Sequence, residues 1–272
     1  NTWSCGCIPG ATDAVEVDHD VTISAEAEIL NLTVNGSGSI EFLTADTLKV
    51  DGDIEFVSGS SLIPGTGTIS IQSSSNAQTI TNNSGGTISF NNLYVNNSGG
   101  LDLTNGTWEL SNSLQVSAGG MDVSGATSFT LLSDASSTSQ ILESMDGAFT
   151  GNFTIQRYIS SRNSNWSNMS SPIESATAAD LDDNLVLSGI GGDDGNARAN
   201  GGNTFYSIWT YNNSAQTTSQ LTALTDDLTP GKGYEVYLAT TAATFSDTTV
   251  DFVGVPHSGL NDGASRQILF RD

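Results

Sequence analysis

The chain has 272 residues, with 30 acidic and only 7 basic side chains, which gives a formal net charge of −23. This acidity repels nucleic acid phosphates and anionic membrane surfaces, and because no run of 18 apolar residues occurs we expect neither nucleic acid binding nor membrane insertion. Charged residues make up 14% of the sequence while glycine, serine, threonine and asparagine are abundant, a composition typical of an all-β protein with many turns.

Residues 1–20 are expected to form an N-terminal cap. Trp3 offers a large apolar surface, Pro9-Gly10 a turn and Val15-Glu-Val17 the first alternating strand. The only cysteines, Cys5 and Cys7, are separated by one glycine and lack a second pair that would complete a tetrahedral zinc site. A local disulfide, a bridge to another segment and two free thiols all stay open.

Residues 21–135 contain short segments that alternate apolar, polar, apolar, as strands with one buried face do. One stretch is written twice: Ile88-Ser-Phe90, Leu93-Tyr-Val95 and Leu101-Asp-Leu103 recur 20, 21 and 20 residues later as Trp108-Glu-Leu110, Leu114-Gln-Val116 and Met121-Asp-Val123. A repeat of this length, with three short strands and no helical pattern, predicts the coils of a right-handed β-solenoid (β-helix).

The alternation also predicts which side chains face the inside of the solenoid. The inward set includes Leu48, Val50, Ile54 and Phe56, and the outward set includes Lys49, Asp53 and Glu55. If the outward acids Glu41, Asp53 and Glu55 stacked on neighbouring coils, they would form a calcium or glycan site; the alternative, which we favour, is an ordinary solvated face.

A serine-rich stretch between residues 130 and 148 interrupts the pattern and marks a domain boundary. The strands beyond it are longer and more aromatic, as in Phe153-Thr-Ile-Gln-Arg-Tyr-Ile159 and Thr204-Phe-Tyr-Ser-Ile-Trp-Thr-Tyr211. They predict that a β-sandwich over residues 150–272 follows the solenoid. The final segment, Arg266–Asp272, has the pattern of a strand without a following turn, so we expect the domain to be truncated there.

A glycine-rich loop over residues 189–202 carries the best candidate for a metal site. Asp193, Asp194 and Asn196 place three oxygen donors within four residues, and Ca²⁺ accepts such ligands without strict geometry. Their spacing differs from that of an EF-hand. An ordinary surface loop is the alternative.

The sequence contains no recognisable catalytic motif, so we expect no enzymatic activity. The nucleophile elbow Gly-x-Ser-x-Gly is absent, His19 and His257 belong to different domains, and Gly231-Lys-Gly-Tyr234 has the pattern of a turn rather than a phosphate-binding loop. Some β-helices are polysaccharide lyases or hydrolases, and here the base would be Lys49, the only basic residue before Arg157. The carboxylate pair of a hydrolase would come from Glu41, Asp53 and Glu55.

Several segments are similar to known sequences. These are Ile8-Pro-Gly-Ala-Thr-Asp-Ala-Val-Glu-Val17, Phe90-Asn-Asn-Leu-Tyr-Val95, Trp166-Ser-Asn-Met-Ser-Ser-Pro-Ile173, Ser207-Ile-Trp-Thr-Tyr-Asn212 and Leu228-Thr-Pro-Gly-Lys-Gly-Tyr-Glu-Val-Tyr-Leu238. They resemble large surface proteins of Bacteroidota that are exported by the type IX secretion system. The resemblance implies an extracellular or cell-surface location and β-helical regions combined with β-sandwich modules, and it transfers no catalytic residue. The C-terminal sorting domain of such proteins is not recognisable, which again predicts a fragment.

The resemblance favours a non-enzymatic module, an adhesin or a structural stalk. The expected partners are surface glycans, other cell-surface proteins and, during export, components of the secretion machinery. The alternatives are a polysaccharide-active β-helix enzyme and a cargo or scaffold component bound to that machinery. Asp46-Thr47-Leu48 and Asp247-Thr248-Thr249 fit the O-glycosylation pattern of Bacteroidota, so Thr47 and Thr248 are candidate glycosylation sites.

Overall fold

The chain divides into two compact units in a computed structural model. The model describes residues 8–73, 76–144, 148–161, 165–191, 199–200, 203–212, 214–241 and 245–257. Among the described residues, one unit, called the N-terminal unit here, lies within 8–132 and 137–153, and the other, the C-terminal unit, lies within 133–136 and 154–257. No helix in the described ranges is long and apolar enough to cross a bilayer.

The N-terminal unit contains three parallel sheets. The first is formed by β1 (Ala14–Val17), β4 (Asn31–Val34), β7 (Ile54–Phe56), β10 (Gln78–Asn82), β12 (Leu101–Thr104), β14 (Met121–Gly125) and β17 (Phe149–Thr150), in that order. The second contains β2 (Asp20–Ile23), β5 (Ser39–Phe42) and β8 (Ser61–Ile63). The third runs through β3 (Ala27–Ile29), β6 (Thr47–Val50), β9 (Thr68–Ser73), β11 (Thr87–Asn97), β13 (Thr107–Ala118) and β15 (Ser128–Leu131), with β16 (Gln140–Ile141) also paired to β13.

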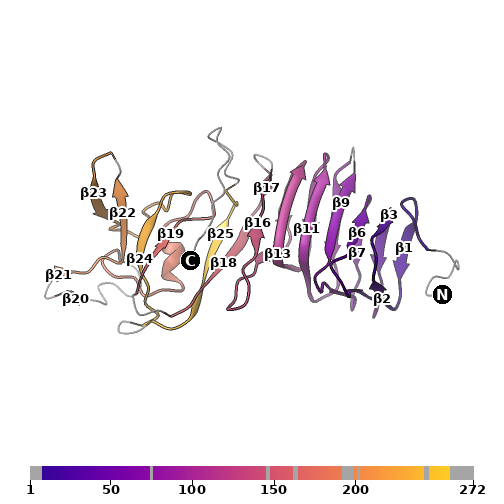
Figure 1. Ribbon diagram of the computed structural model, residues 1–272, viewed down its shortest axis with the longest axis horizontal. Helices are drawn as coiled ribbons and strands as arrows, with labels where there is room; N and C mark the ends of the chain where they lie inside the picture. Colours follow the sequence, from indigo (N-terminus) through magenta and orange to yellow (C-terminus); the bar gives the residue numbers. More distant parts are fainter. Residues whose placement is uncertain are drawn as a thin grey trace. The chain divides into compact units, whose positions relative to one another are not determined.

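This strand order confirms the β-solenoid prediction. In the first coils every strand pairs in parallel with the strand three positions further along the chain, so that each coil lies on the next (Figure 1). The repeat also has the predicted register, because Ile88 lies opposite Trp108, Leu93 opposite Leu114, and Leu101 opposite Met121. Repeated apolar residues therefore stack on their counterparts in the next coil.

Segments that the sequence pattern predicts as separate strands form single long strands in the structure. The segments around Phe90 and Leu93 belong to one strand of 11 residues, β11, and their counterparts belong to the 12-residue β13. The polar residues between them change the register through a bulge instead of making a turn. The Asn91 side chain donates a hydrogen bond to Ser111 Oγ in the next coil (3.3 Å), which holds the two bends together.

The interior of the solenoid is apolar, as predicted from the alternation. Leu48, Val50, Ile54 and Phe56 are all at most 2% exposed. Trp108 is fully buried and its ring stacks on Phe90, with centroids 5.6 Å apart and planes 4° apart, while Phe56 contacts it edge-on at 6.4 Å. The indole nitrogen of Trp108 donates to the Asn105 carbonyl oxygen (2.8 Å), so the only polar atom of the side chain is satisfied.

Buried amide side chains line one edge of the same interior. Asn97 is 0% exposed and its amide nitrogen donates to the carbonyl oxygens of Asn76 (2.8 Å) and Gly100 (2.8 Å) and to Gln78 Oε1 (3.0 Å). Gln78 in turn donates to the Val50 and Gly52 carbonyl oxygens of the preceding coil (3.0 and 2.6 Å). At this corner the two amide side chains donate hydrogen bonds to backbone carbonyl oxygens, and buried carbonyl oxygens need such partners.

The C-terminal unit is built around an antiparallel sheet. Its strand order is β19 (Trp166–Met169), β24 (Tyr234–Tyr237), β22 (Ile208–Asn212) and β23 (Thr217–Gln220). The unit also contains β18 (Phe153–Ile159), the helix α1 (Ala179–Asp182), the two-stranded β20 (Ala199–Asn200) and β21 (Asn203–Thr204), and β25 (Thr248–Gly254).

The core of this unit lies on one side of the antiparallel sheet. It combines Ile208, Tyr234 and Val236 of the sheet with apolar side chains of α1, β18 and β25. The antiparallel pairing supports the predicted β-sandwich in part. The segment around Gly231 is a turn, as predicted. The Tyr234 hydroxyl stabilises it by accepting a hydrogen bond from Thr229 N (2.9 Å) and donating one to the Asp227 carbonyl oxygen (3.0 Å).

Candidate functional site

Aromatic side chains gather on the outer face of the antiparallel sheet, opposite its core. In β24, Tyr234 and Val236 point into the core, so Glu235 and Tyr237 point outward. Cross-strand partners share a face, which places Trp166, opposite Tyr237, and Trp209, opposite Glu235, on the outer side as well. We call the rings of this surface the aromatic face: Trp166, Phe205, Tyr206, Trp209, Tyr211 and Tyr237.

Three of these rings form a cluster at one end of the face. Trp166 and Phe205 both meet Tyr237 edge-on, with centroid distances of 5.1 and 4.9 Å, and the rings of Trp166 and Phe205 lie 5.8 Å apart. The Asn165 side chain donates to the Tyr237 hydroxyl (3.1 Å). All three rings are half-buried, so the cluster is fixed by its own contacts while part of each ring stays in solvent.

A second ring group lies further along the sheet. Tyr206 and Trp209 meet edge-on at 6.3 Å, and the Trp209 indole nitrogen donates to the Tyr206 carbonyl oxygen (2.9 Å). Gly189 adopts φ +84° where a Cβ would collide with the Tyr206 ring, so the close approach of this segment requires glycine. Tyr211 is 48% exposed at the end of β22. We call Tyr206 and Trp209 the ring pair.

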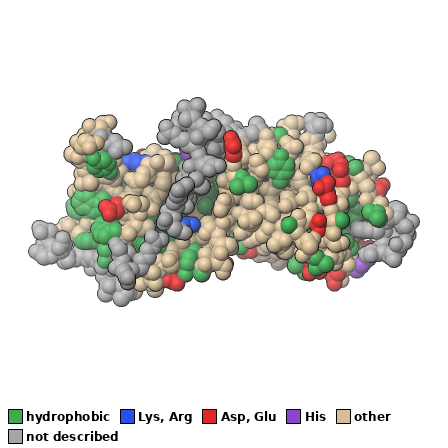
Figure 2. Space-filling view, viewed as in Figure 1, with side chains coloured by type: hydrophobic (Ala, Val, Ile, Leu, Met, Phe, Trp, Pro, Cys, Tyr) green, Lys and Arg blue, Asp and Glu red, His purple; other side chains and the backbone are tan. Residues whose placement is uncertain are grey.

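Polar side chains lie beside the rings on the same side of the sheet. Glu235 is exposed and pairs across the sheet with Asn168 on one side and Trp209 on the other, and Trp209 pairs with Gln220. Figure 2 shows hydrophobic side chains gathered at the left of the view, over this sheet, with an acidic side chain among them. Flat rings beside amide and carboxylate groups can stack on the C–H faces of sugar rings and hydrogen-bond to their hydroxyls.

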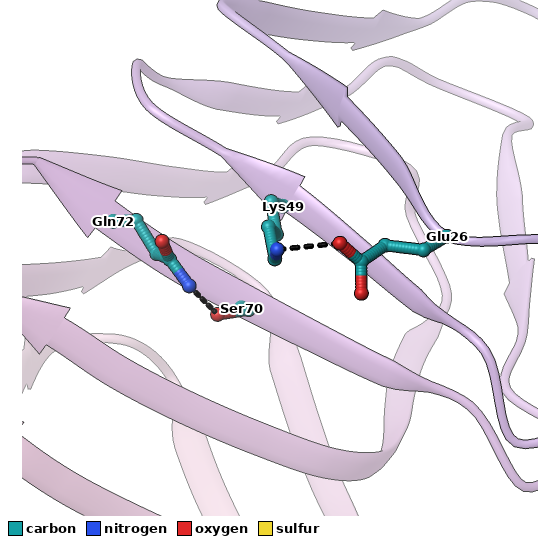
Figure 3. A network of polar contacts seen from close by, with 4 residues as sticks. All are labelled: Glu26, Lys49, Ser70 and Gln72. Carbon is teal, nitrogen blue, oxygen red and sulfur yellow. Dashed lines mark hydrogen bonds and ion pairs between the residues drawn. The ribbon is translucent and has the colours of Figure 1, made fainter. Parts of the chain in front are cut away.

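The solenoid's lysine is held in an ion pair. Lys49 Nζ lies 2.6 Å from Glu26 Oε1, beside the hydrogen bond from Gln72 to Ser70 Oγ on the neighbouring strand (Figure 3). The hydrogen bond to Glu26, with a further contribution from Glu28, raises the pKa of Lys49 above its ordinary value. The ammonium group therefore stays protonated at neutral pH and is a poor general base.

The carboxylate row that would make a site on the solenoid does not form. Glu41 lies on β5 between Thr22 and Ile63, whereas Glu55 lies on β7 between Thr33 and Thr81, in a different sheet. Asp53, which directly precedes β7, accepts a hydrogen bond from Thr79 N (2.8 Å). The hypothesis of a stacked row is therefore wrong, and within the described ranges no three His, Cys, Asp or Glu side chains come together as a metal site.

The remaining predicted sites stay predictions. Cys5 and Cys7, and the calcium candidates Asp193, Asp194 and Asn196, lie outside the described residues. Thr47 is half-buried on β6 next to Thr68, and Thr248 is half-buried at the start of β25.

Two carboxylates of the C-terminal unit have pKa values shifted in opposite directions. Asp247 accepts hydrogen bonds from the Tyr158 hydroxyl (2.6 Å) and from Ser161 N (2.7 Å), which lower its pKa. Burial raises the pKa of Asp251, against a smaller opposing effect of a hydrogen bond with Gln156. Asp251 Oδ1 is a buried atom without a hydrogen-bond partner in the described part of the chain.

These shifts predict opposite pH effects of two matched substitutions. A carboxyl group whose native-state pKa is raised stabilises the folded state only below its unfolded-state pKa, and this stabilisation is lost as the pH rises. Asp251→Asn should therefore raise the melting temperature at pH 7 and change it little at pH 4. A carboxyl group whose native-state pKa is lowered stabilises the folded state above its unfolded-state pKa. Asp247→Asn should therefore lower the melting temperature at pH 7. This decrease should become smaller as the pH falls through the native-state pKa of Asp247. Scanning calorimetry at both pH values checks this, and effects of equal size at the two pH values would contradict it.

No family model, curated protein or solved structure matches this chain. Sequence reasoning did not identify the aromatic face, because it assigned the large rings to the packing of two sandwich layers. The sequence does contain one indication of it, the alternation in Tyr234-Glu-Val-Tyr237. If Tyr234 and Val236 face the core, then Tyr237 lies on the other face together with Glu235.

Proposed function

We propose that this chain is a non-enzymatic extracellular or cell-surface module that binds surface glycans through the aromatic face, with the β-solenoid as a structural stalk. The observation that carries the proposal is the set of half-buried rings on the side of the antiparallel sheet that faces away from its core. Rings in this position contribute little to the core, and the neighbouring Asn168 and Glu235 offer hydrogen-bonding groups to a ligand.

The fixed geometry of the rings supports binding. Trp166, Phe205 and Tyr237 hold one another at 4.9 to 5.8 Å, so they lose little conformational freedom when a ligand stacks on them. Tyrosine and tryptophan combine a large apolar surface with a polar atom, which suits a ligand such as a sugar that has apolar and polar edges.

The solenoid supports the role of a stalk. Its outward polar groups hydrogen-bond to one another from coil to coil: Asn83 donates to Glu55 (3.1 Å), and Asn105 donates to Asn83 (2.9 Å). Such ladders stabilise an extended stack without any ligand. The separation of Glu41 from Glu55 and the ion pair of Lys49 favour binding over cleavage of a polysaccharide.

The acidic composition and the sequence resemblance support an extracellular location. A net charge of −23 keeps a protein soluble and monomeric, and the similar surface proteins of Bacteroidota operate outside the cell.

Native affinity electrophoresis with a panel of neutral and acidic polysaccharides tests the proposal, with new reducing ends assayed in the same samples. We expect retardation by at least one polysaccharide, no new ends, and about tenfold weaker binding for Trp166→Ala, or ~1.4 kcal/mol. Tyr94→Ala is the matched control, because Tyr94 is a half-buried outward ring on β11 of the N-terminal unit. No retardation by any polysaccharide would refute glycan binding, and equal losses in both variants would refute the aromatic face as its site. New ends that disappear in Glu41→Gln or Glu55→Gln would point to an enzyme.

A further inference from the structure

We infer that the aromatic face binds an internal stretch of an uncharged glycan chain, which contacts the three-ring cluster and the ring pair at the same time. This inference rests on the proposed function and deepens it by naming the class of ligand. Three features carry it: the distance between Trp166 and Trp209, the polar row at the level of Trp209, and the charge of that row.

The ring groups adjoin at Phe205 and Tyr206, which are consecutive in the chain, but their tryptophans are too far apart for a single sugar. Trp166 is on β19 and Trp209 on β22, with β24 between them, so their strands are separated by about 10 Å, twice the usual spacing of neighbouring strands. Trp209 is level with Asn168, two residues beyond Trp166, which adds about 7 Å along the strand. The resulting separation of about 12 Å between the Cα atoms exceeds one pyranose ring and suits a short run of linked sugars.

A row of polar side chains crosses the sheet at the level of Trp209. Asn168, Glu235 and Gln220 lie on the same level of their strands, with Trp209 between the last two. The two amides donate and accept hydrogen bonds, and the carboxylate accepts them. A glycan chain that runs from Trp166 to Trp209 would pass Asn168 and Glu235 and present its hydroxyl groups to them.

The charge of the row selects an uncharged ligand. Glu235 is exposed, and no lysine or arginine is among the outward residues of the described strands β19, β24, β22 and β23. A uronate or sulfate group placed there would meet a carboxylate without a counter-charge, in a protein that is already strongly acidic. A neutral polysaccharide avoids this repulsion.

Titration calorimetry with oligosaccharides of increasing length tests the inference. The neutral probes are cello-oligosaccharides and laminari-oligosaccharides of one to six sugars, and the acidic probe is the oligogalacturonate series. We expect affinity for one neutral series to rise about tenfold or more between the disaccharide and the tetrasaccharide and then level off, because two subsites on one chain add their effects. The oligogalacturonates should bind at least about tenfold more weakly than the neutral series at low salt.

Substitutions at two positions separate the components of the site. Trp209→Ala should remove the gain with length while affinity for the disaccharide changes less than about threefold. Trp209→Leu keeps apolar bulk beside Tyr206 without the ring and should behave in the same way, which provides a readout if the alanine variant does not fold. Glu235→Gln removes the charge and should improve oligogalacturonate binding about threefold or more, with the neutral series nearly unchanged.

The outcomes distinguish this inference from the proposed function. If no polysaccharide or oligosaccharide binds, glycan binding itself is refuted. Binding that is sensitive to Trp166→Ala but independent of length and of Trp209 would leave glycan binding in place and overturn the two-subsite inference. Oligogalacturonates that bind as tightly as the neutral series, with no response to Glu235→Gln, would overturn the choice of an uncharged ligand.

Discussion

Replacing Trp108 by alanine is expected to lower the free energy of unfolding of the N-terminal unit by about 3–5 kcal/mol. The side chain is fully buried between Phe90 and Phe56, and its removal would leave a cavity that the fixed neighbouring strands cannot fill. The indole hydrogen bond to the Asn105 carbonyl oxygen would also be lost. Trp108→Phe keeps a ring against Phe90 and should lose less than the alanine variant.

Chemical denaturation followed by circular dichroism measures this effect. Leu43→Ala is the matched control, because Leu43 is a large apolar side chain that is 62% exposed in the same unit, and its removal should change the free energy of unfolding by less than about 0.5 kcal/mol. A loss below about 1 kcal/mol for Trp108→Ala would mean that the aromatic stack does not stabilise the solenoid in the way its burial indicates.

The second large effect is expected at Asn97. Asn97→Ala removes the amide that donates to the Gly100 carbonyl oxygen and to Gln78, and the oxygen that accepts from Gly99 N (2.8 Å). Several backbone groups would remain buried without partners, so we expect a loss of about 2–4 kcal/mol. Because Gln78 is itself held by the preceding coil, the damage should extend to the contact between coils.

The neighbouring asparagine provides an internal comparison. Asn96 is exposed on the outer surface of β11, and Asn96→Ala should change the melting temperature by no more than a degree or two. Thermal melting of both variants under the same conditions checks the prediction. Similar shifts for the two substitutions would contradict the structural role given to the buried amide of Asn97.

Much of the solenoid can be predicted from the sequence, because the repeat and the alternation both arise from the need to bury apolar side chains that stack from coil to coil. A residue such as Val95 must be apolar to face the interior, and its counterpart Val116 must match it because the two stack directly. The burial of residues at the corners between strands cannot be predicted in this way. Asn96 and Asn97 are identical in type, and only the fold shows that one is in solvent and the other closes a backbone turn in the interior.

The aromatic face was harder to predict for a related reason. Trp108 and Trp209 are both tryptophans within alternating strands, but a strand pattern does not show which of its two faces another layer covers. Trp108 lies inside a closed coil, whereas Trp209 is half-buried on the side of its sheet that faces away from the core. The distinction depends on contacts between distant segments, which no local pattern records.

The parallel pairing of successive coils also determines how the N-terminal unit would respond to a pulling force. Backbone hydrogen bonds join each coil only to the coils directly before and after it, and they run along the direction in which the coils stack. A load applied along that direction would open these bonds one coil at a time rather than shear all of them together. A stack of coils loaded in this way would lengthen in small steps and absorb work at each step.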